Sequence, residues 1–408
     1  MRTVGIVCEY NPFHNGHLNH MRRAAAHPDG EFVVCVMSSD FLQRGEPAIL
    51  PKNLRAESAI MNGADMVFEL PSVFSCSSAE FYASSAVQMM GRLGIVDSIV
   101  FGAEDNDIEF LKKIASILVD EPEDFKILLK NYLYTGVSFA KARSNAISEY
   151  LGNTDASKVT AGSNNILGIE YIKSIMRERL PINPVSVPRI AEEYKNDFIA
   201  GNYPSATAIR RSIMETGLDS VKEFLPSSTF NLLENFYTDN NNFINMELLK
   251  DAIFYRIAAL SPIELSEFHG VSEGFENRLK SSLSSSSTIS GFIETCATKR
   301  YPKTRIARIL IHILLDLKKD DAEGIWSKGP LYARLLAASK KGMSLIPVLE
   351  RNSSIPVFTS LKPFYGNARP SWKTILDYEQ KASDIYSTAA GLPTGRDFTI
   401  KFNTYSTN

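Results

Sequence analysis

The alternation of short apolar runs with helical segments in the first hundred residues constrains the fold most. Apolar, β-branched runs occupy residues 4–7, 32–37, 66–70 and 98–101, and segments with helical periodicity separate them. This spacing indicates βαβ units and therefore a parallel sheet covered by helices on both faces. Because right-handed crossovers bring the carboxyl ends of the strands to one edge, we expect a ligand to bind there.

Beyond the first hundred residues the pattern is mainly helical. Residues 108–151 are amphipathic with no strand candidate, residues 163–180 predict another helix, and residues 184–188 are extended. A turn and a helix are predicted at residues 204–215. Helical periodicity then dominates from about residue 218 to 319, and the last ninety residues mix helix with strand-like runs at 344–349 and 355–359.

The length of 408 residues predicts two or three structural units. We place an α/β domain at residues 1–216, with a helical insertion at about 108–160. Residues 217–408 are expected to form a mostly α-helical region that ends in a small mixed α/β part.

Composition narrows the class of protein. Hydrophobic residues make up 44% and charged residues 22%, which is typical of a globular chain. The net charge of −2 argues against a globally basic nucleic-acid binder but allows a local basic patch. The four cysteines form no CxxC pair, so we expect free thiols in a reducing compartment and no zinc site. Without a signal peptide or a membrane-length apolar run, a cytoplasmic location is expected.

The turn after the first strand, residues 11–17, carries the strongest chemical signal, N-P-F-H-N-G-H. Pro12 stiffens the strand exit, and Gly16 allows close approach of a ligand. The helix that follows offers free N–H groups and the positive end of its dipole to a phosphate. His14 and His17 can add imidazole donors that stabilise charge during nucleotidyl transfer, so we predict both as catalytic residues. The alternative is a pair of helix-start histidines without a role.

A second helix start has similar properties. Ser205 and Thr207 offer capping hydroxyls, and Arg210 follows in the first turn, which together can form a second anion site. The alternative is an ordinary N-cap with a surface arginine. His20 can equally belong to the helix surface or support the first turn locally.

These two motifs resemble those of HIGH-type nucleotidyltransferases, although Ala206 replaces a hydroxyl residue of the second motif. Longer blocks resemble the tRNA(Met) cytidine acetate ligase family, and the similarity covers most of the chain. The blocks are residues 5–17, 41–48, 63–65 with 69–71, 101–104 and 164–168.

The resemblance implies a Rossmann-like nucleotidyltransferase domain and a defined reaction. Members of the family activate acetate with ATP, forming acetyl-adenylate and pyrophosphate. The acetyl group then passes to N4 of the wobble cytidine of elongator tRNA(Met), giving N4-acetylcytidine and AMP. The expected co-substrate is ATP, with Mg²⁺ inferred from ATP chemistry because no dense carboxylate motif marks a metal site. The oligomeric state stays open.

The resemblance also assigns ATP-binding residues. Gly102, Asn164 and Arg189 would contact the nucleotide together with Ser205, Thr207 and Arg210. The nucleotide loop would comprise Val7, Cys8, Glu9, Tyr10, Asn11, Pro12, Phe13, His14, Asn15, Gly16, His17, Leu18, Asn19 and His20. A plain strand-to-loop turn at Gly102, a helix cap at Asn164 and a surface charge at Arg189 are the alternatives.

Two further groups are candidates for the acceptor side. Gln43, Arg44 and Glu46 follow the second strand and can bind substrate or phosphates, unless an Arg–Glu pair merely holds their loop. A basic cluster with Tyr301 interleaved is a candidate tRNA surface, because phosphate contacts position RNA and aromatic rings stack on unpaired bases. The cluster comprises Lys299, Arg300, Lys303, Arg305 and Arg308, and Lys340 and Lys341 form a second patch; the candidate contact residues are Lys299, Arg300 and Arg305. The alternative is a solvated helix face.

Two other functions remain open from the residues alone. One is a cofactor-biosynthesis adenylyltransferase on the same scaffold, although the large helical second half exceeds what such an enzyme needs. The other is a non-catalytic RNA-binding protein, which would have no use for His14, Gly16 and His17 as a phosphate site.

Overall fold

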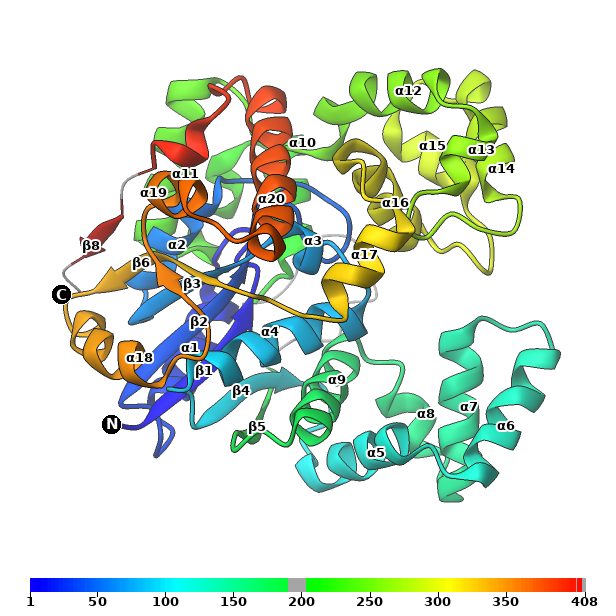
Figure 1. Ribbon diagram of the computed structural model, residues 1–408, viewed down its shortest axis with the longest axis horizontal. Coiled ribbons are helices and arrows are strands. Elements are labelled where there is room, and N and C mark those ends of the chain that lie inside the picture. Colours follow the sequence, from blue (N-terminus) through cyan, green and yellow to red (C-terminus); the bar gives the residue numbers. More distant parts are fainter. Residues whose placement is uncertain (190–202, 401, 406–408) are drawn as a thin grey trace.

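The computed structural model describes residues 1–189, 203–400 and 402–405, and it is built around one sheet (Figure 1). In the first part of the chain, strands and helices alternate as predicted. The elements are β1 (Thr3–Cys8), α1 (Asn15–Ala25), β2 (Phe32–Ser38), α2 (Lys52–Met61), β3 (Met66–Leu70), α3 (Ser72–Ser75), α4 (Ala79–Leu93) and β4 (Ser98–Ala103).

The strand order creates a switch point beside β1. The sheet runs β5-β4-β1-β2-β3-β6-β7, and β8 pairs with β6. Strands β1 to β5 are parallel, and β1 pairs with both β2 and β4. The chain therefore adds strands on one side of β1 and then returns to the other side. In sheets of this kind, the crevice between the carboxyl ends of the two central strands is the ligand site.

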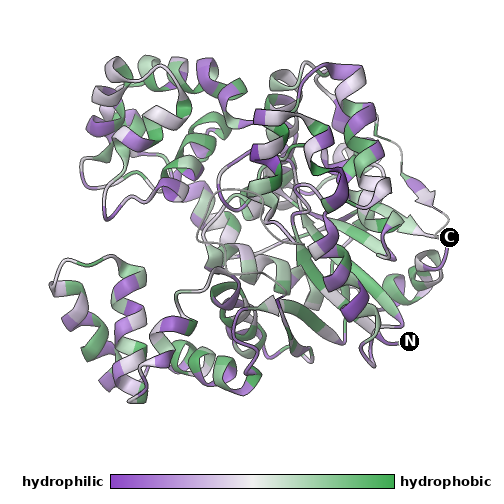
Figure 2. Cartoon of the chain, turned by 180° about the vertical axis from the view of Figure 1, so that it is seen from behind, coloured by the Kyte–Doolittle hydropathy of each residue, from purple (hydrophilic) through white to green (hydrophobic). Residues whose placement is uncertain are grey.

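Each face of the sheet is covered by helices, as the alternation predicts. Along β2, Val33, Cys35 and Met37 pack with residues of α1 and α2, whereas Val34 and Val36 belong to the core on the α4 side. In Figure 2 the central strands are coloured hydrophobic over most of their length. This double burial explains the nearly continuous apolar run of β2.

Two helical lobes project from the same side of the sheet domain (Figure 1). The first contains the predicted insertion, α5 (Ile108–Asp120), α6 (Glu123–Tyr134), α7 (Phe139–Leu151) and α8 (Asp155–Val159). The chain then returns to the sheet through α9 (Ser163–Glu178), β5 (Asn183–Pro188) and α10 (Ala206–Thr216).

The second lobe belongs to the predicted helical region after residue 217. This region contains η1 (Leu218–Phe224), α11 (Ser227–Asn240), η2 (Met246–Leu249), α12 (Lys250–Ala259), α13 (Pro262–Ser266), α14 (Phe275–Ser282), η3 (Leu283–Ser285), α15 (Ile289–Cys296), α16 (Lys303–Leu315) and α17 (Lys319–Trp326). None of the helices in the described part of the chain has the length and apolar character needed to cross a membrane.

The last part of the chain returns to the sheet. Its elements are β6 (Ala333–Ser339), η4 (Gly342–Leu345), α18 (Ile346–Asn352), β7 (Val357–Phe358), α19 (Leu361–Gly366), α20 (Pro370–Ala389), η5 (Arg396–Phe398) and β8 (Asn403–Tyr405). Strand β6 pairs antiparallel with β3, and β7 and β8 pair parallel with β6.

One predicted strand in this part is wrong. Residues 344–349 belong to η4 and α18, because Pro347 suits the start of a helix and a short apolar run does not distinguish strand from helix. The α/β class and the mixed end are confirmed. The division of the chain at residues 216 and 217 stays a prediction, and the sheet draws strands from both sides of it.

Candidate active site

A cavity of about 600 Å³ lies at the carboxyl ends of β1 and β4, at the predicted edge of the sheet. Its walls include the turn before α1, the start of α10, residues after β2 and part of α16. Nineteen of the predicted site residues line it: Val7, Cys8, Glu9, Tyr10, Asn11, His14, Gly16, His17, Asn19, His20, Gln43, Arg44, Glu46, Gly102, Asn164, Arg189, Ser205, Thr207 and Arg210.

The two histidines of the first motif cap α1. The Nδ1 atom of His14 accepts a hydrogen bond from the Gly16 N–H at 3.0 Å, and Nδ1 of His17 accepts from the His14 N–H at 3.3 Å. The two rings lie 3.8 Å apart between centroids. A Cβ atom on Gly16 would lie 2.8 Å from Cε1 of His14, so only glycine leaves the ring in this place.

This capping arrangement defines the proton positions on the histidines. Burial, followed by the charges of Arg189 and Arg210, lowers the pKa of His14 to about 3. Burial and the neighbouring His14 lower the pKa of His17 well below its usual value. Both rings are therefore neutral near pH 7. Because each Nδ1 accepts a backbone N–H, each ring carries its proton on Nε2 and can donate there.

The second helix start is joined directly to the first. The Ser205 hydroxyl accepts the Ala208 N–H at 3.2 Å and caps α10. Arg210 extends across the cavity, where Nη1 donates to the Asn11 carbonyl at 2.7 Å and Nη2 forms an ion pair with Glu46. The two predicted anion sites therefore face one cavity, and the Arg–Glu pair considered from the sequence forms between Glu46 and Arg210 rather than Arg44.

The opposite end of the cavity carries Gly102, Asn164 and Arg189. No atom lies within 4 Å of a Cβ built on Gly102, so a side chain there would enter open space beside the cavity. The Glu104 carboxylate accepts the backbone N–H groups of Asn164 and Asn165 at the start of α9, and the Asn164 side chain donates to it through Nδ2 at 2.6 Å. Arg189 lies 4.0 Å from the same carboxylate. Glu104 thus holds both candidate nucleotide contacts, a role that its sequence block alone did not indicate.

Some predicted residues lie outside the cavity wall. Pro12, Phe13 and Leu18 are not among its lining residues, and the Asn15 amide donates instead to the Glu223 carbonyl at 2.9 Å. Lining residues that were not predicted for the nucleotide site include Arg23, Tyr82, Tyr171, Thr304 and Arg308. Arg23 follows the first motif on α1, and Arg308 belongs to the basic cluster predicted for the tRNA.

The predicted basic cluster lies on the second lobe, where Arg308 lines the cavity and the three candidate residues do not. Lys299 is exposed, and Arg300 is exposed but paired with Glu273 at 2.5 Å. Arg305 stacks over the Tyr301 ring at 4.2 Å. The idea that Tyr301 stacks on RNA bases is wrong, because its ring is buried and stacked on Phe275 at 3.9 Å.

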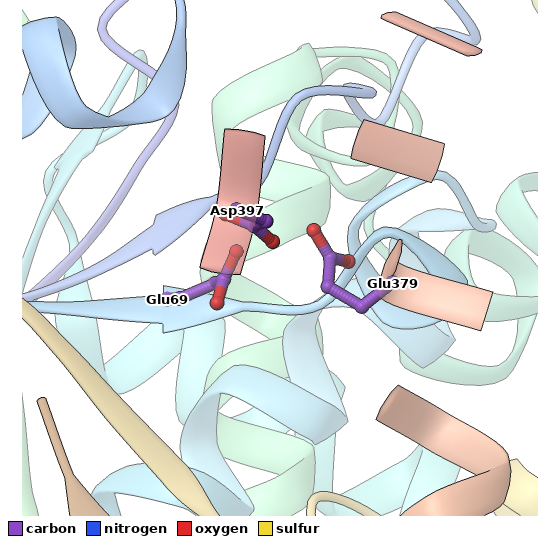
Figure 3. Close-up of side chains that lie close together, drawn as sticks. All are labelled: Glu69, Glu379 and Asp397. Carbon is purple, nitrogen blue, oxygen red and sulfur yellow. The ribbon is translucent and has the colours of Figure 1, made fainter. Parts of the chain in front are cut away.

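A separate acidic group lies in the core, where Glu69, Glu379 and Asp397 approach one another (Figure 3). The ammonium of Lys52 lies 2.5 Å from Glu69 and 2.8 Å from each of the other two carboxylates. Lys52 therefore supplies the cation that these carboxylates need. We call the whole group the buried ionic cluster; it comprises Asp40, Lys52, Glu69, Arg334, Glu379 and Asp397.

Comparison with known proteins shows the family of this chain. A family model described as HIGH Nucleotidyl Transferase matches residues 1–397. A tRNA(Met) cytidine acetate ligase of Halothermothrix orenii is 37% identical over 399 residues, which cover 95% of this chain and 94% of the relative. One of Acetivibrio thermocellus is 38% identical over 392 residues, with the same coverage of both chains. The chain belongs to the tRNA(Met) cytidine acetate ligase family. The resemblance drawn from its motifs is confirmed.

Solved structures agree with the family assignment. The apo form I crystal structure of Thermotoga maritima TmcAL is 31% identical and superposes with a TM-score of 0.95 over 99% of this chain and 100% of that one. Form II of the same protein, bound with alpha-thio ATP, gives 0.92 at the same identity and coverage. The shared fold therefore includes the lobes as well as the sheet.

Proposed function

We propose that this protein is an ATP-dependent ligase that activates acetate as acetyl-adenylate and transfers the acetyl group to N4 of the wobble cytidine of elongator tRNA(Met). The observation that carries the proposal is the cavity in which two capped helix starts, those of α1 and α10, face each other through Arg210. Its neighbour of the same fold binds an ATP analogue, and its curated relatives are named as ligases of this kind.

The residues suit the first half-reaction. An acetate oxygen forms a bond to the α-phosphorus while the bond to the pyrophosphate oxygen breaks. Charge grows on the phosphate oxygens, and donors fixed before the reaction stabilise this charge without reorganisation. The Nε2–H groups of His14 and His17, the free N–H groups of the α1 start and the Arg210 guanidinium are such donors. Neutral histidines are sufficient, because the reaction needs hydrogen bonds here rather than proton transfer.

The nucleoside end of the site is assigned to Gly102, Asn164 and Arg189. Gly102 leaves space beside the strand, and Glu104 holds the two polar side chains in place. Mg²⁺ would be held by the phosphates of ATP and by water, and would supply positive charge that favours the departure of pyrophosphate. The residues fit a metal held in this way, because the cavity carboxylate Glu46 is already paired with Arg210.

The second half-reaction needs the tRNA. The cytidine amine attacks the acyl carbon, the bond to the AMP oxygen breaks, and the amine loses a proton. For RNA binding we assign the exposed Lys299 and Arg300 on the second lobe, with Arg305 supporting this surface from α16. A cytoplasmic location follows from the tRNA substrate.

Pyrophosphate release tests the proposal. Purified protein is supplied with ATP and Mg²⁺, with or without acetate and tRNA(Met). Release that depends on acetate is expected, and N4-acetylcytidine should form only when tRNA is added. Release that requires a phosphorylated co-substrate would point instead to a cofactor adenylyltransferase. If no pyrophosphate is released under any of these conditions, the protein is a non-catalytic RNA-binding protein.

His14→Ala tests the role of the first motif. The variant loses the cap on Gly16 and one Nε2–H donor, so acetate-dependent pyrophosphate release should fall by about 100-fold or more. The circular dichroism spectrum should stay that of the wild type. An unchanged rate in a folded variant would refute the role assigned to His14.

A further inference from the structure

Helix α16 of the second lobe forms part of the cavity wall through direct backbone contact with the sheet domain. The contact is made by Gly45, in the loop 41–48 that follows β2. A Cβ on Gly45 would lie 2.2 Å from the Arg308 backbone nitrogen and 2.4 Å from the Ala307 carbonyl carbon. This close approach brings Thr304 and Arg308 into the cavity lining.

Arg308 is a half-buried guanidinium with few partners. Its Nη1 donates to the Gln43 carbonyl at 3.1 Å, and it forms no ion pair within the described part of the chain. By contrast, Arg210 is paired with Glu46. Burial lowers the pKa of the Arg308 guanidinium, and the nearby Arg305 adds to this effect. A partly buried cation without a carboxylate partner is stabilised when an anionic ligand binds beside it.

The position of Arg308 distinguishes it from the phosphate-binding groups. The phosphate end is formed by the starts of α1 and α10, and the nucleoside end by Gly102 and Asn164. The remaining wall includes Glu9, Gln43, Ala79, Tyr82, Thr304 and Arg308, and the other cation beside it, Arg44, is exposed rather than half-buried. Gln43 connects Arg308 to Glu9 within this wall. Its N–H donates to Glu9 at 2.8 Å, and its carbonyl accepts from Arg308.

We propose that Arg308 binds the carboxylate of the acid substrate before it attacks ATP. This inference rests on the proposed function and adds the substrate-binding residue to it. The carboxylate must approach a triphosphate that is itself negative, so a cation at this wall offsets the repulsion. A guanidinium also matches a carboxylate with two parallel hydrogen bonds, which orients the attacking oxygen. One carboxylate oxygen then bonds to the α-phosphorus, pyrophosphate leaves with the electron pair, and no proton moves.

Acetate-dependent exchange of labelled pyrophosphate into ATP, measured without tRNA, tests this proposal. For the full-length Arg308→Gln variant, the KM for acetate should rise about 10- to 100-fold, because a charge-assisted bidentate contact is lost. The KM for ATP should stay within about twofold of the wild-type value. Arg308→Lys keeps the positive charge but loses the bidentate geometry, so its KM for acetate should lie between those of the wild type and Arg308→Gln. Arg351→Gln, an exposed arginine on α18 outside the cavity lining, is the matched control and should leave both constants unchanged.

Chemical rescue separates substrate binding from structural damage. Added guanidinium ion should restore part of the acetate-dependent exchange to Arg308→Ala, but none to His14→Ala. An unchanged KM for acetate in a folded Arg308→Gln variant would overturn the proposal. If the only rise is in the KM for tRNA, measured from N4-acetylcytidine formation, the proposal is also overturned and Arg308 belongs to the RNA site. An equal rise in the KM for ATP would place it with the phosphates. Failure of the wild-type protein to bind ATP in calorimetry would instead refute the proposed function itself.

Discussion

At the scale of single residues, the site depends on one absent side chain. Gly16 is the second residue of α1, where alanine would normally favour the helix. Its hydrogen is needed because a methyl group would lie 2.8 Å from the His14 ring. The placement of the His14 ring therefore overrides helix propensity at this position.

Gly16→Ala should displace the His14 ring and weaken ATP binding. We expect the dissociation constant for ATP in calorimetry to rise about 10- to 100-fold, equivalent to one lost charge-assisted hydrogen bond. Gly324→Ala, inside α17 with no atom within 4 Å of its Cβ, is the control. It should bind ATP normally and gain up to about 1 kcal/mol in unfolding free energy. Equal ATP affinities in the two variants would contradict the argument.

At the scale of elements, the contact between the loop 41–48 and α16 couples the second lobe to the active site. Gly45 has φ +80°, and its hydrogen faces the backbone of α16, which cannot move aside as a flexible side chain can. The loop also forms the bridge between Phe41 and Pro47 and holds Glu46 beside Arg210. The positions of Arg308 on α16 and of the Glu46–Arg210 pair therefore both depend on Gly45.

Gly45→Ala should lower the unfolding free energy through both conformation and contact. Gly136→Ala is the matched control, because Gly136 has φ +76° and no atom within 4 Å of its Cβ. Both variants incur the left-handed cost of about 1–2 kcal/mol. Gly45→Ala should lose about 1–3 kcal/mol more in urea unfolding, the usual cost of overpacking. If Gly45→Ala and Gly136→Ala lose the same unfolding free energy, the contact between the loop and α16 contributes nothing to stability.

Elements with local signals could be predicted from the sequence, whereas those fixed by distant contacts could not. The strand, turn and helix from Thr3 to Ala25 carry their own periodicity and caps, so the sequence alone places both histidines at the helix start. Strand β6 reads ARLLAAS, which has no β-branched residue, and pairing with β3 makes it a strand. Arg308 stands in the predicted basic cluster, but it reaches the cavity through a contact with Gln43 that spans 265 residues, which no local pattern indicates.

At the scale of the whole molecule, the buried ionic cluster joins the first strands to the end of the chain. Lys52 of α2 and Glu69 of β3 meet Glu379 of α20 and Asp397 of η5. With Asp40 and Arg334 the cluster holds four carboxylates and two cations, so ionisation of all four carboxyls would leave an excess of negative charge. Burial, with the neighbouring carboxylates, raises the pKa of Glu379 to about 8, whereas Arg334 and Lys52 hold the pKa of Asp397 at about 2 despite its burial.

These shifts predict how stability depends on pH. Histidines with lowered pKa values, such as His14 at about 3 and His312 at about 4, bind protons more readily when unfolded. The unfolding free energy should therefore fall as pH drops below about 6.5. Glu379 acts in the opposite sense: the folded state keeps a proton that the unfolded state loses, so stability falls as pH rises toward 8. Because the histidines outnumber Glu379, urea unfolding across pH 5 to 8 should show a maximum near pH 6.5.

Two amide substitutions in the same cluster distinguish its protonated carboxyl from an ionised one. Glu379→Gln replaces a neutral group by a neutral group of the same shape, but its NH₂ faces either Lys52 or the Ser72 N–H, so near pH 6.5 it should cost about 1–3 kcal/mol. It should also abolish the loss of stability between pH 6.5 and 8. Asp397→Asn removes an ionised partner of Lys52 and Arg334 and should cost about 3–5 kcal/mol, the usual result of breaking a buried ion pair. If the two variants lose equal stability at pH 6.5, both carboxylates are ionised and the alkaline limb of the profile has another origin.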